Sequence, residues 1–137
     1  MAEQNAKLPL DCAISKLTAP VIEGKKIGRK IGFPTANQLF SQDTPIPAHG
    51  VYASIAVIDG IRYAAVSNIG TRPTVSGTSV NCESYILDYS DDLYNKDITV
   101  YFMRFLRDEE RFDSLDTLKR TIEADVSKAQ LYLYDYL

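Results

Sequence analysis

Histidine and cysteine, which supply most zinc sites and many nucleophilic enzymes, are scarce in this sequence. Its 137 residues include one histidine, His49, and two cysteines, Cys12 and Cys82, which lie far apart and outside any CxxC motif. The sequence therefore predicts neither a zinc site nor a disulfide framework, and a reducing cytoplasm is the expected location. A Ser-His-Asp hydrolase is also disfavoured, because no GxSxG motif accompanies His49.

Long apolar runs and an excess of positive charge are missing as well. No stretch predicts a membrane span, and no signal-peptide pattern opens the chain. The formal net charge of −3 argues against a general nucleic-acid-binding protein, which would carry an excess of Lys and Arg. We therefore expect neither a membrane nor a nucleic-acid partner. We also expect a monomer.

The common motifs of phosphate-binding and metalloprotease sites do not occur. The chain has no GxxxxGK[ST] loop, no GxGxxG after a predicted strand, and no HRD, DFG or HExxH motif. A nucleotide site in this chain would have to be built in another way.

Short β-rich segments separated by turn residues occupy most of the chain before Phe112. The clearest pair flanks Asp59-Gly60, a dipeptide typical of a type I′ hairpin turn. Residues 80–89 (VNCESYILDY) and 98–107 (ITVYFMRFLR) are also predicted as strands. Two segments rich in Pro and Gly, residues 41–50 and 70–79, are predicted as loops that could close over a site.

After Phe112 the apolar residues recur at steps of three or four, the period of an amphipathic helix. Ser114 is placed as an N-cap and Asp116 in the first turn, so we expect one helix over about residues 114–135. The chain is then a single mainly β domain, an antiparallel sheet or barrel with a helix packed on it. Residues 1–10 are expected to be loosely held. The periodic apolar residues are Leu115, Leu118, Ile122, Val126, Ala129 and Leu133.

The most distinctive stretch is residues 28–37, GRKIGFPTAN. Its glycines permit positive φ or close backbone approach, and Pro34 fixes its own φ. If this stretch is extended, Thr35 and Asn37 point the same way, so that a hydroxyl and an amide oxygen converge on one ligand. A tight connection between two strands is the alternative. The nearby cations, which suit a small anion, are Lys25, Lys26, Arg29 and Lys30.

Glu83 is the acid of greatest interest, because it falls within a predicted strand. Alternation places it on the same face as Asn81, Tyr85 and Leu87. It is either a solvated carboxylate on an outer face or a general base held on a rigid strand beside a reacting hydroxyl. Periodicity does not separate these two interpretations.

Six segments in order make the chain resemble a riboflavin kinase domain, as found in the C-terminal half of bifunctional bacterial riboflavin kinase/FAD synthetases. The resemblance covers roughly residues 12–130, and its most specific parts are GFPTAN and the spacing from CES through LY and FLR to RFDSLDTL. The six segments are GKKIGRKIGFPTAN, GVYA, NIGTRPT, CESYILDYSDDLY, ITVYFMRFLR and RFDSLDTLKRTIEADVSKA.

The resemblance implies a six-stranded antiparallel Greek-key barrel with one C-terminal helix. It also implies an ATP-dependent transfer of phosphate to riboflavin, giving FMN, with Mg²⁺ as the metal and riboflavin/FMN and ATP/ADP as ligands. Carried over to this sequence, Glu83 is the catalytic base, which also contacts the flavin, and Arg107 and Phe112 lie in a mobile flap over the flavin. Thr35 and Asn37 bind the metal, and the implied ATP-binding residues are Gly28, Arg29, Gly32, Pro34, Thr35 and Asn37.

Two positions depart from the family pattern. Ala19, followed by Pro20, stands where many relatives have glycine, so the turn into the phosphate loop could be shaped differently. Asn95 stands where glycine usually follows the tyrosine, but asparagine tolerates the left-handed conformation. Most bacterial relatives also carry an adenylyltransferase domain before this one.

Two other functions are alternatives to the kinase. A flavin-binding regulatory domain would keep the barrel without turnover, but it would not need a base such as Glu83. A nucleic-acid-binding barrel would need aromatic side chains among the cations of residues 25–30, and only Phe33 is near.

Overall fold

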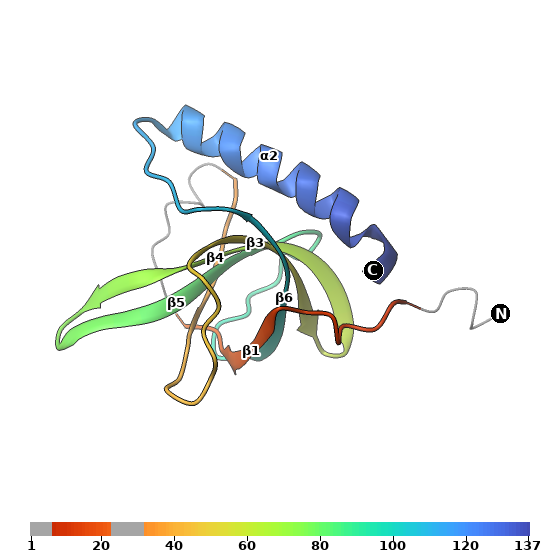
Figure 1. Ribbon diagram of the computed structural model, residues 1–137, viewed down its shortest axis with the longest axis horizontal. Coiled ribbons are helices and arrows are strands. Elements are labelled where there is room, and N and C mark those ends of the chain that lie inside the picture. Colours follow the sequence, from red (N-terminus) through yellow and green to blue (C-terminus); the bar gives the residue numbers. More distant parts are fainter. Residues whose placement is uncertain (1–6, 23–31) are drawn as a thin grey trace.

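The computed structural model describes residues 7–22 and 32–137 and shows a small β-barrel with a helix on one side (Figure 1). Six antiparallel strands form one sheet in the spatial order β1-β6-β3-β4-β5-β2, which confirms the expected mainly β fold. The strands are β1 (Ser15–Pro20), β2 (Ala36–Leu39), β3 (Gly50–Ile58), β4 (Ile61–Thr74), β5 (Gly77–Ile86) and β6 (Asp97–Arg107), and the helix is α2 (Leu115–Leu133).

The hairpin predicted at Asp59-Gly60 joins β3 to β4. Both turn residues have positive φ, 52° and 80°, as a type I′ turn requires. Asn95, in the link between β5 and β6, has φ 66°, so it adopts the left-handed conformation expected of it.

The sheet is nearly closed into a barrel between its two outer strands, β1 and β2. Just after β1, the Ile22 amide donates to the Asn37 carbonyl of β2 at 2.8 Å. The Gln38 side chain, which is fully buried, reaches across the same gap: its Nε2 donates to the carbonyls of Ala19 in β1 and Ile98 in β6 at 2.9 and 3.0 Å. One side chain thus replaces part of the missing strand-to-strand ladder.

Alternating side chains build two apolar clusters, one on each face of the sheet. The cluster inside the barrel includes Leu17, Tyr52, Ile69, Cys82 and Phe102. The cluster outside the barrel lies under α2 and includes Val51, Ala53, Ile55, Met103, Ala129 and Leu133.

The C-terminal helix begins as predicted. Ser114 is the N-cap, and its Oγ accepts a hydrogen bond from the Thr117 amide at 3.2 Å. The helix ends at Leu133, and a single 3-10 turn, Tyr134–Tyr136, continues the chain. Within the described ranges, no helix combines the length and apolar character needed to cross a bilayer.

The prediction of a loop over residues 70–79 was wrong. β4 and β5 run to the end of a long hairpin and pair from Gly70 with Asn81 to Thr74 with Gly77, which leaves a two-residue tip (Figure 1). Beyond Ile69, β4 pairs only with β5, and a strand partnered on one side accommodates Pro73, which has no amide donor. Residues 41–49 form the predicted loop before β3.

Candidate active site

The cluster formed by Thr35, Asn37, Asn81 and Glu83 lies where β2 pairs with β5 on the outer face of the barrel. Asn37 is directly opposite Glu83 in the register. The Thr35 hydroxyl lies 3.4 Å from Glu83 Oε2, to which it donates, and Asn81 Nδ2 donates to Asn37 Oδ1, also at 3.4 Å. The structure therefore brings together the three residues that the sequence singled out for metal binding and catalysis.

Strand alternation explains why these side chains share a face. Cys82 and Ile86 of β5 point into the barrel, so Asn81, Glu83 and Tyr85 point outward. Asn37 lies between the inward-facing Ala36 and Gln38 of β2 and therefore also points outward.

An aromatic pair lies beside the cluster. The ring of Phe33 contacts the ring of Tyr85 edge to face, with centroids 5.1 Å apart. Such pairs are worth about 0.5–1.5 kcal/mol beyond the apolar area they bury. The contact holds the GFPTAN segment against β5, next to Thr35 and Glu83.

One of the two glycines of the GRKIGFPTAN stretch, Gly32, lies in the described turn before β2. Gly32 has φ 88°, a conformation in which a side chain would be strained, and Pro34 follows in an exposed position. The other ATP-binding residues of the prediction, Gly28 and Arg29, lie outside the described residues, as do Lys25, Lys26 and Lys30.

The oxygen atoms of this cluster suit Mg²⁺, a hard cation that takes oxygen ligands and keeps several waters. Thr35 and Asn37 offer a hydroxyl and an amide oxygen, next to the Glu83 carboxylate. Within residues 7–22 and 32–137, no group of three or more His, Cys, Asp or Glu side chains could hold a metal ion by itself.

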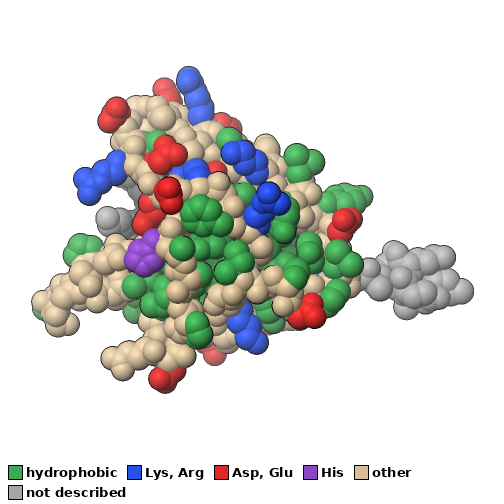
Figure 2. Space-filling view, viewed as in Figure 1, with side chains coloured by type: hydrophobic (Ala, Val, Ile, Leu, Met, Phe, Trp, Pro, Cys, Tyr) green, Lys and Arg blue, Asp and Glu red, His purple; other side chains and the backbone are tan. Residues whose placement is uncertain are grey.

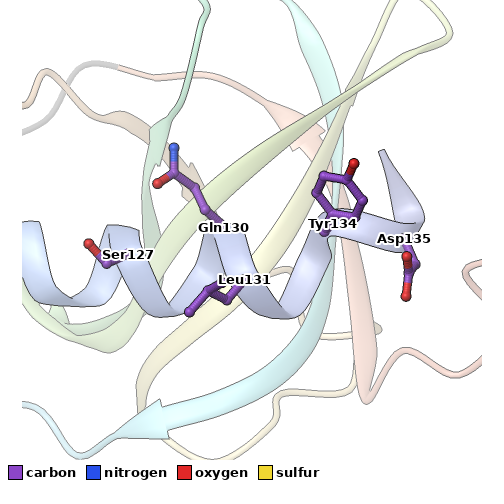
Figure 3. A pocket seen from close by; sticks show the side chains of 5 residues that line it. All are labelled: Ser127, Gln130, Leu131, Tyr134 and Asp135. Carbon is purple, nitrogen blue, oxygen red and sulfur yellow. The ribbon is translucent and has the colours of Figure 1, made fainter.

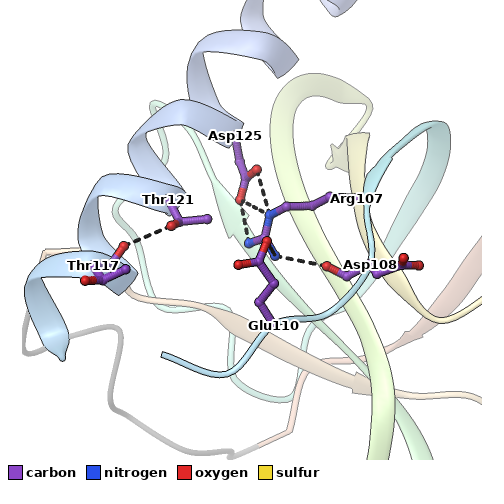
Figure 4. A network of polar contacts seen from close by, with 6 residues as sticks. All are labelled: Arg107, Asp108, Glu110, Thr117, Thr121 and Asp125. Atoms are coloured by element: carbon purple, nitrogen blue, oxygen red, sulfur yellow. Dashed lines mark hydrogen bonds and ion pairs between the residues drawn. The ribbon is translucent and has the colours of Figure 1, made fainter. Parts of the chain in front are cut away.

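Arg107 and Phe112, the two residues predicted at the flavin, form a second group beside α2. The Arg107 guanidinium carbon lies 5.8 Å from the centre of the Phe112 ring. Its nitrogens also bind Asp125 of α2, with Nε to Oδ1 at 3.1 Å and Nη2 to Oδ2 at 2.9 Å (Figure 4). In this structure Arg107 thus joins the end of β6 to the helix.

The exposed side of α2 has a hollow that lies apart from the predicted site residues (Figure 3). It is lined by Ser127, Gln130, Leu131, Tyr134 and Asp135, with one carboxylate and no cation. We assign no phosphate chemistry to it, because a phosphate site needs amide donors or positive charge. On the face shown in Figure 2, acidic and basic side chains are intermixed rather than separated by sign.

Sequence reasoning did not assign Asn81, Asn68 or Asp125 to the site. Alternation did place Asn81 on the same face as Glu83, but no role was given to it. Asn68 is the partner of Glu83 in the register between β4 and β5, and Asp125 binds Arg107 from the helix. These last two follow from pairings that connect distant parts of the chain, which one sequence does not reveal.

Known proteins from several organisms are similar to this chain. The bifunctional riboflavin kinase/FMN adenylyltransferase of Pseudomonas fluorescens is 41% identical over 116 residues, which make up 84% of this chain and 37% of that protein. A solved Streptococcus pneumoniae structure, described as a macrolide-efflux protein, is 33% identical with a TM-score of 0.78 over 84% of this chain and 38% of its own. The riboflavin kinase of Trypanosoma brucei, at 23% identity and TM-score 0.59, covers 87% of this chain and 79% of its own, and shows the fold alone.

The chain spans between 35% and 37% of the length of the first bacterial relatives it matches. The family model for flavokinase, described as riboflavin kinase, matches residues 14–133 and so covers the barrel and nearly all of α2. The chain belongs to the flavokinase family.

Proposed function

We propose that this chain transfers the γ-phosphoryl group of MgATP to the 5′-hydroxyl of the ribityl chain of riboflavin, giving FMN and ADP. The observation that carries the proposal is the meeting of Thr35, Asn37 and Glu83 on one face of the barrel. The amide and carboxylate of the register pair Asn37–Glu83, with the Thr35 hydroxyl beside it, supply the groups that phosphoryl transfer to an alcohol needs.

Each residue then has a role. Glu83 accepts the proton of the 5′-hydroxyl as its oxygen bonds to the γ-phosphorus, while the bond from that phosphorus to the bridging oxygen of ADP breaks. Thr35 and Asn37 are the residues that would hold Mg²⁺, which neutralises charge on the phosphate oxygens when bound. The Phe33–Tyr85 contact keeps the segment with Thr35 next to Glu83.

Glu83→Gln tests the proposal, because Gln keeps the size and one acceptor oxygen but does not readily take a proton. We expect wild-type protein with riboflavin, ATP and Mg²⁺ to form FMN, measured by chromatography. In the variant, kcat should fall by about 10²- to 10⁴-fold, the usual contribution of a positioned base. Mg-ATP binding and the melting temperature should change little.

The controls separate this function from its alternatives. Glu123→Gln, the same change at an exposed position of α2, should leave kcat unaltered. Riboflavin binding without FMN formation by the wild type would instead indicate a flavin-binding regulatory domain. A fully active Glu83→Gln enzyme would show that Glu83 is not the base.

A further inference from the structure

Asp125 is a buried acid with one strong partner among the described residues. It lies on the sheet-facing side of α2, and its residue is only 2% exposed. Both carboxylate oxygens accept hydrogen bonds from Arg107, whose Nε also lies 3.2 Å from Oδ2 (Figure 4). A fork of this kind fixes the direction of the guanidinium as well as its position.

Arg107 in turn contacts the chain that follows β6. Its Nη1 donates to the Asp108 carbonyl at 3.1 Å and lies 3.8 Å from Glu110 Oε1. Its guanidinium carbon also faces the Phe112 ring. We call residues 108–112 the strap. Asp125 of α2 is therefore linked to the strap by the hydrogen bonds of Arg107.

The strap makes a second contact at Gly70 of β4, where the Glu109 side chain lies against bare backbone. A Cβ added to Gly70 would be 2.5 Å from Glu109 Oε2 and 3.0 Å from its Cδ. Gly70 is directly opposite Asn81, and the next outward-facing pair of the same hairpin is Asn68 with Glu83. Glu109 thus lies beside the cluster that contains the proposed base.

We propose that Asp125 and Gly70 are positioning residues that hold the strap beside the acceptor site, Asp125 through Arg107 and Gly70 through Glu109. This inference rests on the proposed function, because it assigns the strap to the riboflavin side of the reaction. A buried ion pair is often no more stabilising than an apolar pair of similar volume, so stability alone does not explain Asp125. A role in holding the strap in one geometry explains why a charged pair is placed there.

The first variant is Asp125→Asn, which keeps the shape of the side chain and removes its charge. We expect kcat/KM for riboflavin to fall by about 10- to 100-fold, since a displacement on the order of 1 Å can cost about that much. The KM for MgATP should change by less than about twofold, because among the described residues no hydrogen bond links Thr35 or Asn37 to the strap. Quenching of riboflavin fluorescence in the presence of ADP gives the flavin affinity without turnover.

The second variant, Gly70→Ala, avoids the risk that a change at the buried Asp125 prevents folding. Gly70 is not among the glycines with positive φ, and its new methyl group would meet only the end of a flexible side chain. We expect it to lower kcat/KM for riboflavin by displacing Glu109. In a Glu109→Ala background, Gly70→Ala should then have little further effect, which a double-mutant cycle measures.

Three results would overturn the inference. Equal losses toward riboflavin and MgATP would indicate general damage, and additive effects of Gly70→Ala and Glu109→Ala would separate those two residues. Wild-type kinetics in both Asp125→Asn and Gly70→Ala would show that these contacts of the strap do not affect the reaction. This last outcome is distinct from failure of the proposed function, in which the wild-type chain itself forms no FMN. Glu123→Gln is the matched control on α2.

Discussion

Replacing Gln38 with Leu tests how the barrel is closed. The side chain is fully buried, and one amide nitrogen serves the carbonyls of Ala19 and Ile98. Leucine has similar bulk and no donor. Both carbonyls would then lose this bond, the Ile98 carbonyl in a buried place and the Ala19 carbonyl in a partly buried one.

The size of the effect follows from these contacts. A net hydrogen bond contributes about 0.5–1.5 kcal/mol, so the two bonds from Gln38 give about 1–3 kcal/mol. Part of this is offset, because Gln38 Oε1 is itself buried without a hydrogen-bond partner in the described structure and leucine removes it. We expect the free energy of unfolding to fall by about 1–2 kcal/mol. For a domain of this length, that lowers the melting temperature by about 3–7 °C.

Urea unfolding followed by circular dichroism measures the change. Gln42→Leu, the same substitution in the exposed loop before β3, should alter the free energy of unfolding by no more than about 0.5 kcal/mol. If Gln38→Leu is as stable as the Gln42→Leu control, the bonds from Gln38 to the two carbonyls do not contribute to stability, and Gln38 does not close the barrel.

The remaining predictions concern single groups. Thr35→Val should weaken Mg-ATP binding by about tenfold or more, as measured by calorimetry, because the hydroxyl is lost; unchanged binding would remove Thr35 from the metal site. Ser114→Ala should lower the free energy of unfolding by about 1 kcal/mol, and a melt identical to wild type would show that the cap is dispensable. Burial raises the pKa of the Cys82 thiol to about 11 from 9.0, so stability should fall as the pH rises from about 9 to about 11, where only the unfolded thiol ionises freely. Rapid labelling of Cys82 in native protein at pH 8 would contradict this. Segment 107–112 should gain protection from hydrogen exchange when riboflavin and ADP bind, and equal protection in both states would argue against a lid.

Local chemistry determined the parts of the fold that the sequence predicted well. Asp59-Gly60 favours one turn type, and the Ser114 cap with the apolar period after it indicates one helix, so both are readable without the rest of the chain. The same holds for the shared face of Thr35 and Asn37, which depends only on an extended backbone.

The failures have a different cause. Residues 70–79 contain the glycine, proline and hydroxyl side chains typical of loops, yet they pair in β4 and β5. Pro73 does not prevent this pairing, because the edge of the strand beside it has no second partner. The bonds of Gln38 and Asp125 depend on strands and a helix that are distant in sequence. Their residue types alone predict exposed polar positions.

Arg62 brings the two ends of the described chain together. Its Nη1 donates to the Leu8 carbonyl at 2.6 Å and to the Tyr136 carbonyl at 3.0 Å, so one nitrogen serves both. Domains in which the first and last segments lie close together often tolerate a change of chain order. A short linker from residue 137 to residue 7, with a new opening at the exposed tip of the β4–β5 hairpin, would give a circular permutant. Such a permutant would keep the cluster of Thr35, Asn37, Asn81 and Glu83. In its chain β5 would come before β2 and would therefore be synthesised first.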